Sequence, residues 1–190
     1  EGDEKKYPAA ETALKQSLQI SPTYDAYSNL GFLYYVQKRY ADAIQAYRQA
    51  LTLNDKDWRV WANLFVCYQW LKDESNIEQT RVKTIEMLEP AVATTPQDGH
   101  MHSMLATLYA GHDKEKAISQ IHTALAMSPK DTDVLADAAI TFETLGDRKQ
   151  AIHYAHESME QGATLSGLQA QEPLQVVLAD PNFRPRGNRR

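Results

Sequence analysis

The sequence predicts an all-α protein built from repeated pairs of antiparallel helices. Two observations predict this fold class. Apolar residues recur at helical spacing, and the pattern returns after 34 positions, from Tyr27 to Trp61. Prolines then follow the second helix of several pairs, at Pro22, Pro96 and Pro129, where they would stop it. With 190 residues, 43% of them hydrophobic, the chain has enough apolar material for an elongated core.

The clearest copy of the pattern spans residues 24–57. It contains two apolar stripes at helical spacing, Tyr27, Leu30, Gly31 and Tyr34 in the first and Ala43, Ile44, Tyr47, Ala50 and Leu51 in the second. A short polar turn over residues 37–40 joins them. Gly31 lies on the first stripe although glycine disfavours a helix, so we expect a neighbouring helix to approach closely there.

These residues resemble the tetratricopeptide repeat, whose pattern W-x2-L-G-x2-Y is followed by a small residue, an aromatic, a second small residue and a proline. The resemblance implies an α-solenoid of tandem hairpins, about ten helices in a right-handed superhelix and a single domain over 1–190. It divides the chain into a half repeat (1–23), four repeats (24–57, 58–98, 99–131 and 132–163), a C-terminal cap (164–183) and a flexible basic tail (184–190).

The second repeat departs from the pattern because its second half carries about seven extra residues. We interpret them as two more turns on a long helix over 76–94. Pro90 falls inside this helix and should kink it or split it near Leu88.

Both ends of the array are distinctive. Tyr7, Ala10, Leu14 and Ser17 are typical of a second helix whose first helix is missing, so we expect upstream sequence in the natural protein. The apolar face of this half repeat could also pair two copies as a homodimer.

At the other end, Pro173, Leu174, Val177 and Leu178 predict a short amphipathic capping helix with Phe183 as its anchor. This segment is similar to the tails of repeat arrays in bacterial serine/threonine kinases, adenylate cyclases and winged-helix regulators.

The face of the first helices opposite their apolar stripe should be solvated, yet it carries aromatic and aliphatic residues. The resemblance places this face in a concave groove that binds an extended or helical peptide. The candidate groove residues are Asn29, Phe32, Tyr35, Val36, Arg59, Asn63, Val66, Trp70 and Met104. Amides such as Asn29 and Asn63 both donate and accept, which suits them to a ligand backbone.

Two alternatives to peptide binding remain at this face. Phe32 and Val66 could simply pack against the first helix of the next repeat. A small molecule could instead occupy a pocket formed by Phe32, Tyr35 and Trp70, which would make the chain a ligand sensor. The last repeat is acidic along the same face, which favours a ligand with a basic end.

The sequence argues against several other classes of protein. The net charge is −5, and it would be −9 without the four arginines among the last seven residues, so nucleic acid is not an expected partner. No apolar run is long enough for membrane insertion. No nucleotide-binding, hydrolase or metalloprotease motif occurs, so we expect a non-catalytic protein without metal or cofactor. Cys67, the lone cysteine, fits a reducing compartment such as the cytoplasm without excluding the periplasm.

Overall fold

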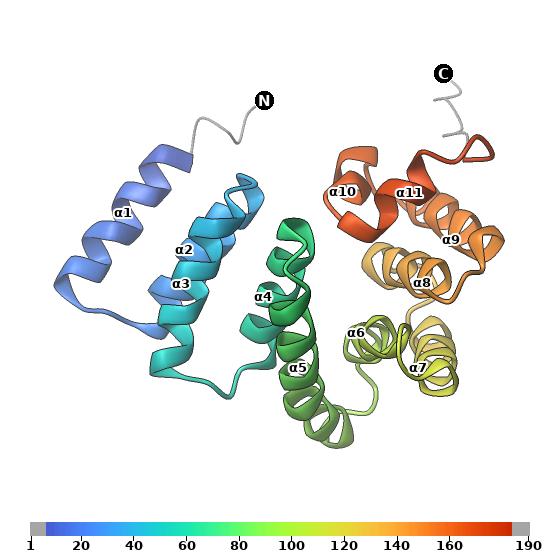
Figure 1. Ribbon diagram of the computed structural model, residues 1–190, viewed down its shortest axis with the longest axis horizontal. Coiled ribbons are helices and arrows are strands. Elements are labelled where there is room, and N and C mark those ends of the chain that lie inside the picture. Colours follow the sequence, from blue (N-terminus) through green and yellow to red (C-terminus); the bar gives the residue numbers. More distant parts are fainter. Residues whose placement is uncertain (1–6, 184–190) are drawn as a thin grey trace. The chain divides into compact units, whose positions relative to one another are not determined.

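The computed structural model describes residues 7–183, and this part of the chain is helical without any strand, as predicted (Figure 1). The helices are α1 (Tyr7–Ile20), α2 (Tyr24–Val36), α3 (Tyr40–Leu53), α4 (Trp58–Leu71), α5 (Glu74–Thr94), α6 (Gly99–Tyr109), α7 (Lys114–Met127), α8 (Thr132–Thr144), α9 (Arg148–Glu160), α10 (Leu165–Gln169), the 3-10 turn η2 (Glu172–Leu174) and α11 (Gln175–Leu178). The predicted basic tail lies outside the described residues. None of the described helices is both long and apolar enough to cross a membrane.

The chain divides into two compact units, with the boundary between Met87 and Leu88. Unit 1 contains α1 to α4 and most of α5, and unit 2 contains the end of α5 and everything that follows. We describe each unit by itself.

Side-chain caps fix where most of the helices begin. The side chain of the residue before the first turn accepts a hydrogen bond from a backbone N–H of that turn at Thr23, Asp57, Asp98, Asp113, Asp131, Asp147 and Thr164. Such a cap satisfies a backbone N–H that has no partner within the helix, and the aspartates also favour the positive end of the helix dipole. The short polar connections between the hairpins therefore define the repeat boundaries.

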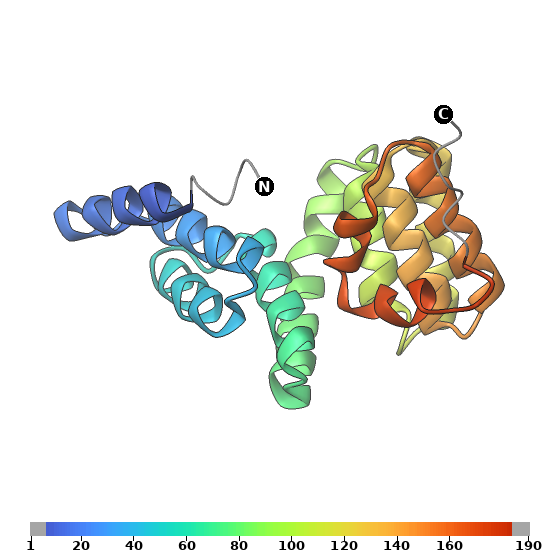
Figure 2. The ribbon, with the colours of Figure 1, turned by 90° about the horizontal axis from the view of Figure 1, so that it is seen from above.

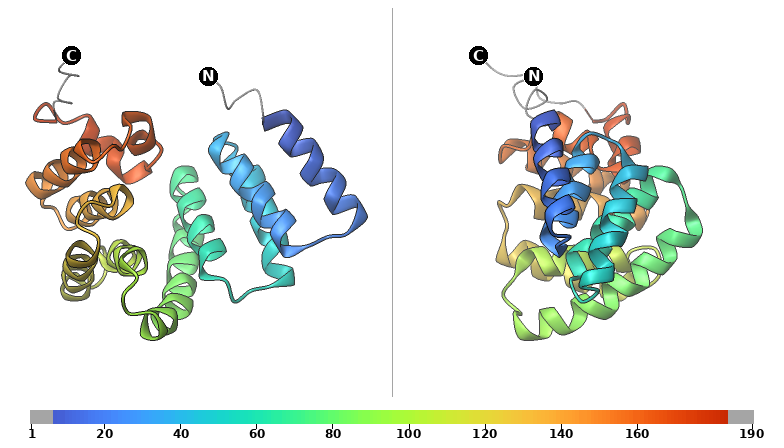
Figure 3. Two further views of the ribbon diagram at one scale, coloured as in Figure 1. Left: turned by 180° about the vertical axis from the view of Figure 1, so that it is seen from behind. Right: turned by 90° about the vertical axis from the view of Figure 1, so that its left-hand side faces the viewer.

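In unit 1, α2 and α3 form a close antiparallel pair, with α1 packed on α2 and α4 on α3 (Figure 3). Tyr47 is fully buried between α2 and α3. A Cβ atom added to Gly31 would lie 2.6 Å from the Tyr47 ring, closer than real Cβ contacts come. The close approach predicted at Gly31 is confirmed.

In the second repeat, α5 follows α4 after the short connection over 72–73, and Ile77 on α5 packs against the core formed by α2, α3 and α4. The repeat position of Gly31 is occupied by Ala106 and Ala139 in the later repeats and by Phe65 in the second. Phe65 is buried, so the second repeat packs a much larger side chain at this position than the others do.

The long helix expected over 76–94 is present as α5, and it runs through Pro90 without splitting at Leu88. Proline removes one backbone hydrogen bond, from the carbonyl four residues earlier. Pro90 and Glu86 both lie on the exposed side of α5, where water can take up the freed carbonyl. The helix therefore tolerates Pro90 at a modest cost.

Unit 2 pairs α6 with α7 and α8 with α9, and α8 packs on α6. Its core is rich in small side chains, and Ala106, Ala117, Ala138, Ala139 and Ala151 are all fully buried. Where glycine occurs in the first repeat, alanine serves the same purpose here at a lower cost in helix propensity.

The predicted C-terminal cap is present in unit 2, as the segment from α10 to α11 that lies over α8 and α9 (Figure 2). It consists of several short helical pieces, and Leu168, Leu174, Val177 and the predicted anchor Phe183 are buried in the core. Arg148 on α9 holds the segment from outside by donating to the carbonyl oxygen of Val176 and to Asp180, both at 3.1 Å.

Candidate functional site

Eight of the nine predicted groove residues lie in unit 1, on α2 and α4, and Met104 lies on α6 in unit 2. Asn29, Phe32, Val36 and Arg59 are exposed, and Tyr35, Asn63, Val66, Trp70 and Met104 are partly buried. Phe32 keeps 56% of its surface exposed, which is high for a phenylalanine on a packed helix. Its ring is therefore accessible to a ligand.

Four aromatic rings form a continuous row in unit 1, which we call the aromatic row. The centroids of Phe32 and Tyr35 are 6.4 Å apart, those of Tyr35 and Tyr40 are 6.0 Å apart, and Tyr40 stacks on Trp70 at 5.3 Å with an interplanar angle of 5°. Rings at these distances attract one another beyond their buried area. The row connects α2, α3 and α4 and ends at the exposed ring of Phe32.

Tyr40 is the member of the row that the sequence pattern did not predict, because it falls in the polar turn expected over 37–40. The structure makes it the first residue of α3. An aromatic residue directly after a polar turn was the available signal, and its contact with Trp70 joins two different repeats.

Two members of the aromatic row carry polar groups that are largely buried. Burial raises the pKa of Tyr35 to about 12, so its phenol stays neutral at physiological pH. The Trp70 Nε1–H is buried and has no acceptor within residues 7–183. An unpaired buried donor is costly, so the Trp70 Nε1–H lowers the stability of unit 1.

The exposed Arg59 lies at the start of α4 in unit 1. Its guanidinium is 3.5 Å from Asp57 and lies 4.9 Å from the centre of the Trp58 ring. Both contacts are at the surface, so they position the side chain more than they stabilise the fold.

In unit 2, a cluster of His100, Ser103, Asp131, Asp133 and Asp137 forms on α6 and at the start of α8, which we call the His–Asp cluster. His100 Nε2 is 3.3 Å from Asp131 Oδ2, and the Ser103 hydroxyl donates to Asp137 Oδ2 at 2.6 Å. The acidic residues looked scattered in the sequence because about thirty positions separate α6 from α8; adjacent repeats bring them together.

His100, Asp131 and Asp133 offer three possible metal-ligand atoms within 4.8 Å of one another. Two of these side chains are exposed and the third is partly buried. A structural metal site usually has four ligands and buried support, so three surface groups leave the coordination incomplete. The cluster instead makes this part of unit 2 acidic, as expected.

Replacing Asp137 with asparagine is expected to stabilise unit 2 at pH 7 by about 1–3 kcal/mol. Burial raises the pKa of Asp137 from 3.8 to about 6, despite the hydrogen bond from Ser103, which opposes the shift. Because the folded pKa is higher than the unfolded one, the charge costs stability above about pH 6, and this cost disappears as the pH falls towards 4.

The difference in unfolding free energy between Asp137→Asn and the unchanged protein gives the contribution of the Asp137 charge to stability. Urea unfolding followed by circular dichroism should give a difference that is largest at pH 7 and shrinks between pH 6 and 4. A difference that does not depend on pH would contradict the assignment.

The tetratricopeptide repeat family model matches residues 24–57. BBSome complex member BBS4 of Xenopus tropicalis is 34% identical over 93 residues, which make up 49% of this chain and 17% of that protein. The chain therefore spans about a fifth or less of the curated relatives it matches.

Two solved structures have a similar fold. TTC0263, a thermophilic TPR protein of Thermus thermophilus, has a TM-score of 0.61 and 17% identity, over 87% of this chain and 88% of that one. YrrB, a TPR protein with an unusual peptide-binding site, has a TM-score of 0.54 and 16% identity, over 88% and 84%. Residues 24–57 are thus a tetratricopeptide repeat, and the chain has the fold of solved tetratricopeptide repeat proteins.

Proposed function

We propose that the chain is a non-catalytic protein-interaction module that binds an extended peptide across α2 and α4 of unit 1. The observation that carries this proposal is the aromatic row, which ends in the exposed ring of Phe32. An accessible aromatic ring beside rigidly packed neighbours is typical of the residues that dominate binding energy at interfaces. The similarity to YrrB, a protein with a peptide-binding site, supports the same class of ligand.

Asn29 and Asn63 would hold the peptide backbone. They occupy the same position in consecutive repeats, 34 residues apart, and Met104 follows at this position in the third repeat. Asn29 is exposed and Asn63 partly buried, and no other side chain pairs with either amide within residues 7–183. Each amide is free to donate to a carbonyl and accept from an N–H of the peptide.

The apolar side chains of the peptide would lie on Phe32, Val36 and Val66. Phe32 and Val36 together expose an aromatic and a β-branched surface on the last two turns of α2. We therefore expect a ligand with at least one large apolar residue. For unit 2 by itself, the acidic His–Asp cluster favours a basic ligand.

Selection of peptides from a displayed random library against the whole chain tests this proposal. Phe32→Ala combined with Asn63→Ala should weaken the selected peptides by about tenfold or more, since hot-spot truncations cost at least 2 kcal/mol. The matched control is Leu53→Ala, which removes an equally exposed apolar side chain from the end of α3. Equal losses in both variants, or no loss in the double variant, would count against this groove.

A small molecule on the aromatic row is the second candidate function, because the exposed face of Phe32 could stack with a flat ligand. The same variants separate the two cases: a small ligand would depend on Phe32 and not on Asn63. A wider role as the interaction end of a larger bacterial signalling protein stays a prediction, as does a homodimer through α1, where Ala10 and Ser17 are exposed.

A further inference from the structure

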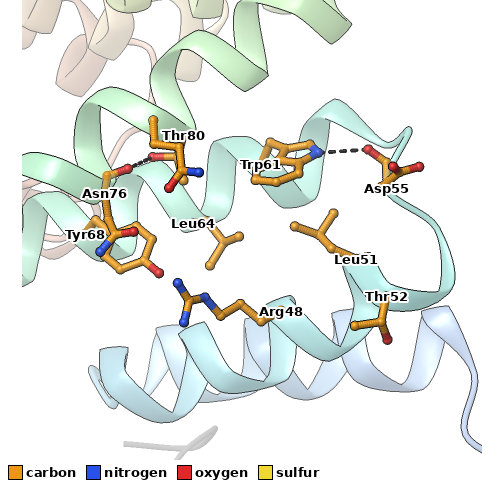
Figure 4. Close-up of a pocket in the computed structure, with 10 residues that line it drawn as sticks. Arg48, Leu51, Thr52, Asp55, Trp61, Leu64, Tyr68, Asn76 and Thr80 are labelled. Atoms are coloured by element: carbon orange, nitrogen blue, oxygen red, sulfur yellow. Dashed lines mark hydrogen bonds between the residues drawn. The ribbon is translucent and has the colours of Figure 1, made fainter.

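We propose a second binding site in unit 1, between α3, α4 and α5, for a carboxylate that carries a short apolar group. A pocket of about 350 Å³ lies there, at the lower end of the range for small-ligand sites (Figure 4). It is lined by Arg48, Leu51, Thr52, Asp55, Trp61, Leu64, Tyr68, Asn76, Gln79 and Thr80. None of these residues belongs to the predicted groove.

The pocket lies where the first turns of α5 meet α3 and α4. Asn76, Gln79 and Thr80 on the first turns of α5 form one wall, and α3 forms the other. Trp61, Leu64 and Tyr68 of α4 complete the lining.

The pocket has an apolar part made of Leu51, Trp61 and Leu64. The Trp61 ring is held in place, since its Nε1–H donates to the carbonyl oxygen of Asp55 at 2.9 Å (Figure 4). Leu64 is 2% exposed, so it is a fixed part of the core. A rigid apolar surface of this kind binds a small hydrophobic group without first having to order itself.

Arg48 supplies the positive charge that would bind the carboxylate. Residues 7–183 contain five arginines, and Arg39, Arg59, Arg81 and Arg148 each pair with a carboxylate. Arg48 has no carboxylate partner in this part of the chain, and its guanidinium points towards Tyr68 at the edge of the pocket (Figure 4). A guanidinium binds a carboxylate through two parallel hydrogen bonds, which makes a carboxylate its best-matched ligand.

Two other polar groups of the wall are already engaged. Asn76 Nδ2 donates to Asp73 at 2.8 Å, and the Thr80 hydroxyl donates to the carbonyl oxygen of Asn76 at 2.6 Å. Asp55 lies beyond Leu51, on the side of the pocket away from Arg48 (Figure 4). Its negative charge would repel a second carboxylate, so the site favours a monocarboxylate over a dicarboxylate.

The carboxylate could belong to a free acid or to the C-terminal residue of a peptide, and one experiment separates the two. The three tryptophans give separate indole N–H signals in a ¹H–¹⁵N NMR spectrum of the full chain. We expect 4-phenylbutyrate at millimolar concentration to shift the Trp61 signal saturably, and 4-phenylbutanol and adipate to bind at least about tenfold more weakly. The tripeptide Gly-Gly-Leu, compared with a free and with an amidated C-terminus, tests whether the site binds the terminal carboxylate of a peptide.

Arg48→Gln should weaken the binding of the acid by about tenfold or more, because a charge-assisted hydrogen bond is lost. Arg59→Gln, which removes an exposed arginine elsewhere on unit 1, and Phe32→Ala should leave it unchanged. The proposal is overturned if neither the acid nor the free peptide shifts Trp61, if the alcohol binds as well as the acid, or if Arg48→Gln binds as tightly as the unchanged chain. Binding by the peptide alone would assign the site to a C-terminus.

Discussion

Replacing Gly31 with valine is expected to destabilise unit 1 by about 3 kcal/mol. A Cβ atom at Gly31 would lie 2.6 Å from Cδ1 and Cε1 of Tyr47, and the two further methyl groups of valine have no space beside them. Tyr47 cannot move aside because it is fully buried between α2 and α3. Alanine should destabilise less, since it regains about 1 kcal/mol of helix propensity relative to glycine.

Urea unfolding followed by tryptophan fluorescence measures this effect, because Trp58, Trp61 and Trp70 all lie in unit 1 and report on it specifically. Gly111→Ala is the control for an added methyl group, since a Cβ atom there meets only Thr144 Cγ2, at 3.9 Å. Because Gly111 lies in unit 2, which contains no tryptophan within residues 88–183, its unfolding is followed by far-ultraviolet circular dichroism. Combining Gly31→Ala with Tyr47→Leu should recover part of the stability that the two single variants lose. A Gly31→Val chain as stable as the unchanged one would refute the close crossing of α2 and α3.

Replacing Leu174 with alanine is expected to destabilise unit 2 by about 2–5 kcal/mol. Leu174 is fully buried, and it comes from the η2 turn that packs on α8. Its removal would leave a cavity and weaken the contact that covers the last hairpin, whose apolar face would otherwise meet water. The loss should appear in thermal unfolding followed by far-ultraviolet circular dichroism.

Val176 offers a matched control for Leu174. It lies two residues later, in α11, but 53% of its surface is exposed, so Val176→Ala should change stability by less than about 0.5 kcal/mol. Comparable losses at both positions would show that the segment is held by its local helices and not by packing on α8. Hydrogen exchange of the α8 and α9 amides distinguishes these cases, because it should quicken in Leu174→Ala and not in Val176→Ala.

The hairpins of the first, third and fourth repeats could be predicted from the sequence because their packing residues are local in pattern. Small residues at the crossing points and large apolar residues at helical spacing leave few ways to pack two neighbouring helices. Gly31 is the best case, since the cost of glycine in a helix indicated a close contact before its partner was known. The cap was predictable for the same reason, through its buried Leu174 and Val177.

The candidate sites were harder to predict, because they depend on residues from different repeats. Tyr40 joins the aromatic row through contacts with Tyr35 on α2 and Trp70 on α4, and neither contact follows a fixed spacing in the chain. Ser103 and Asp137, 34 positions apart, meet for the same reason. Side chains on adjacent helices come into contact according to the crossing geometry, which periodicity alone does not specify.

The sequence by itself determined that the chain is a series of helical hairpins with a C-terminal cap. The 34-residue period, the apolar stripes and the prolines that end helices can all be read from residues that are close together in the sequence. The tertiary structure alone decided that a pocket beside Trp61 lies next to Arg48, which has no carboxylate partner within residues 7–183. The physical reason is that three helices, α3, α4 and α5, contribute to the pocket, and the repeat pattern does not fix the geometry in which they cross. That geometry governs which surfaces are filled by protein and which are left for a ligand.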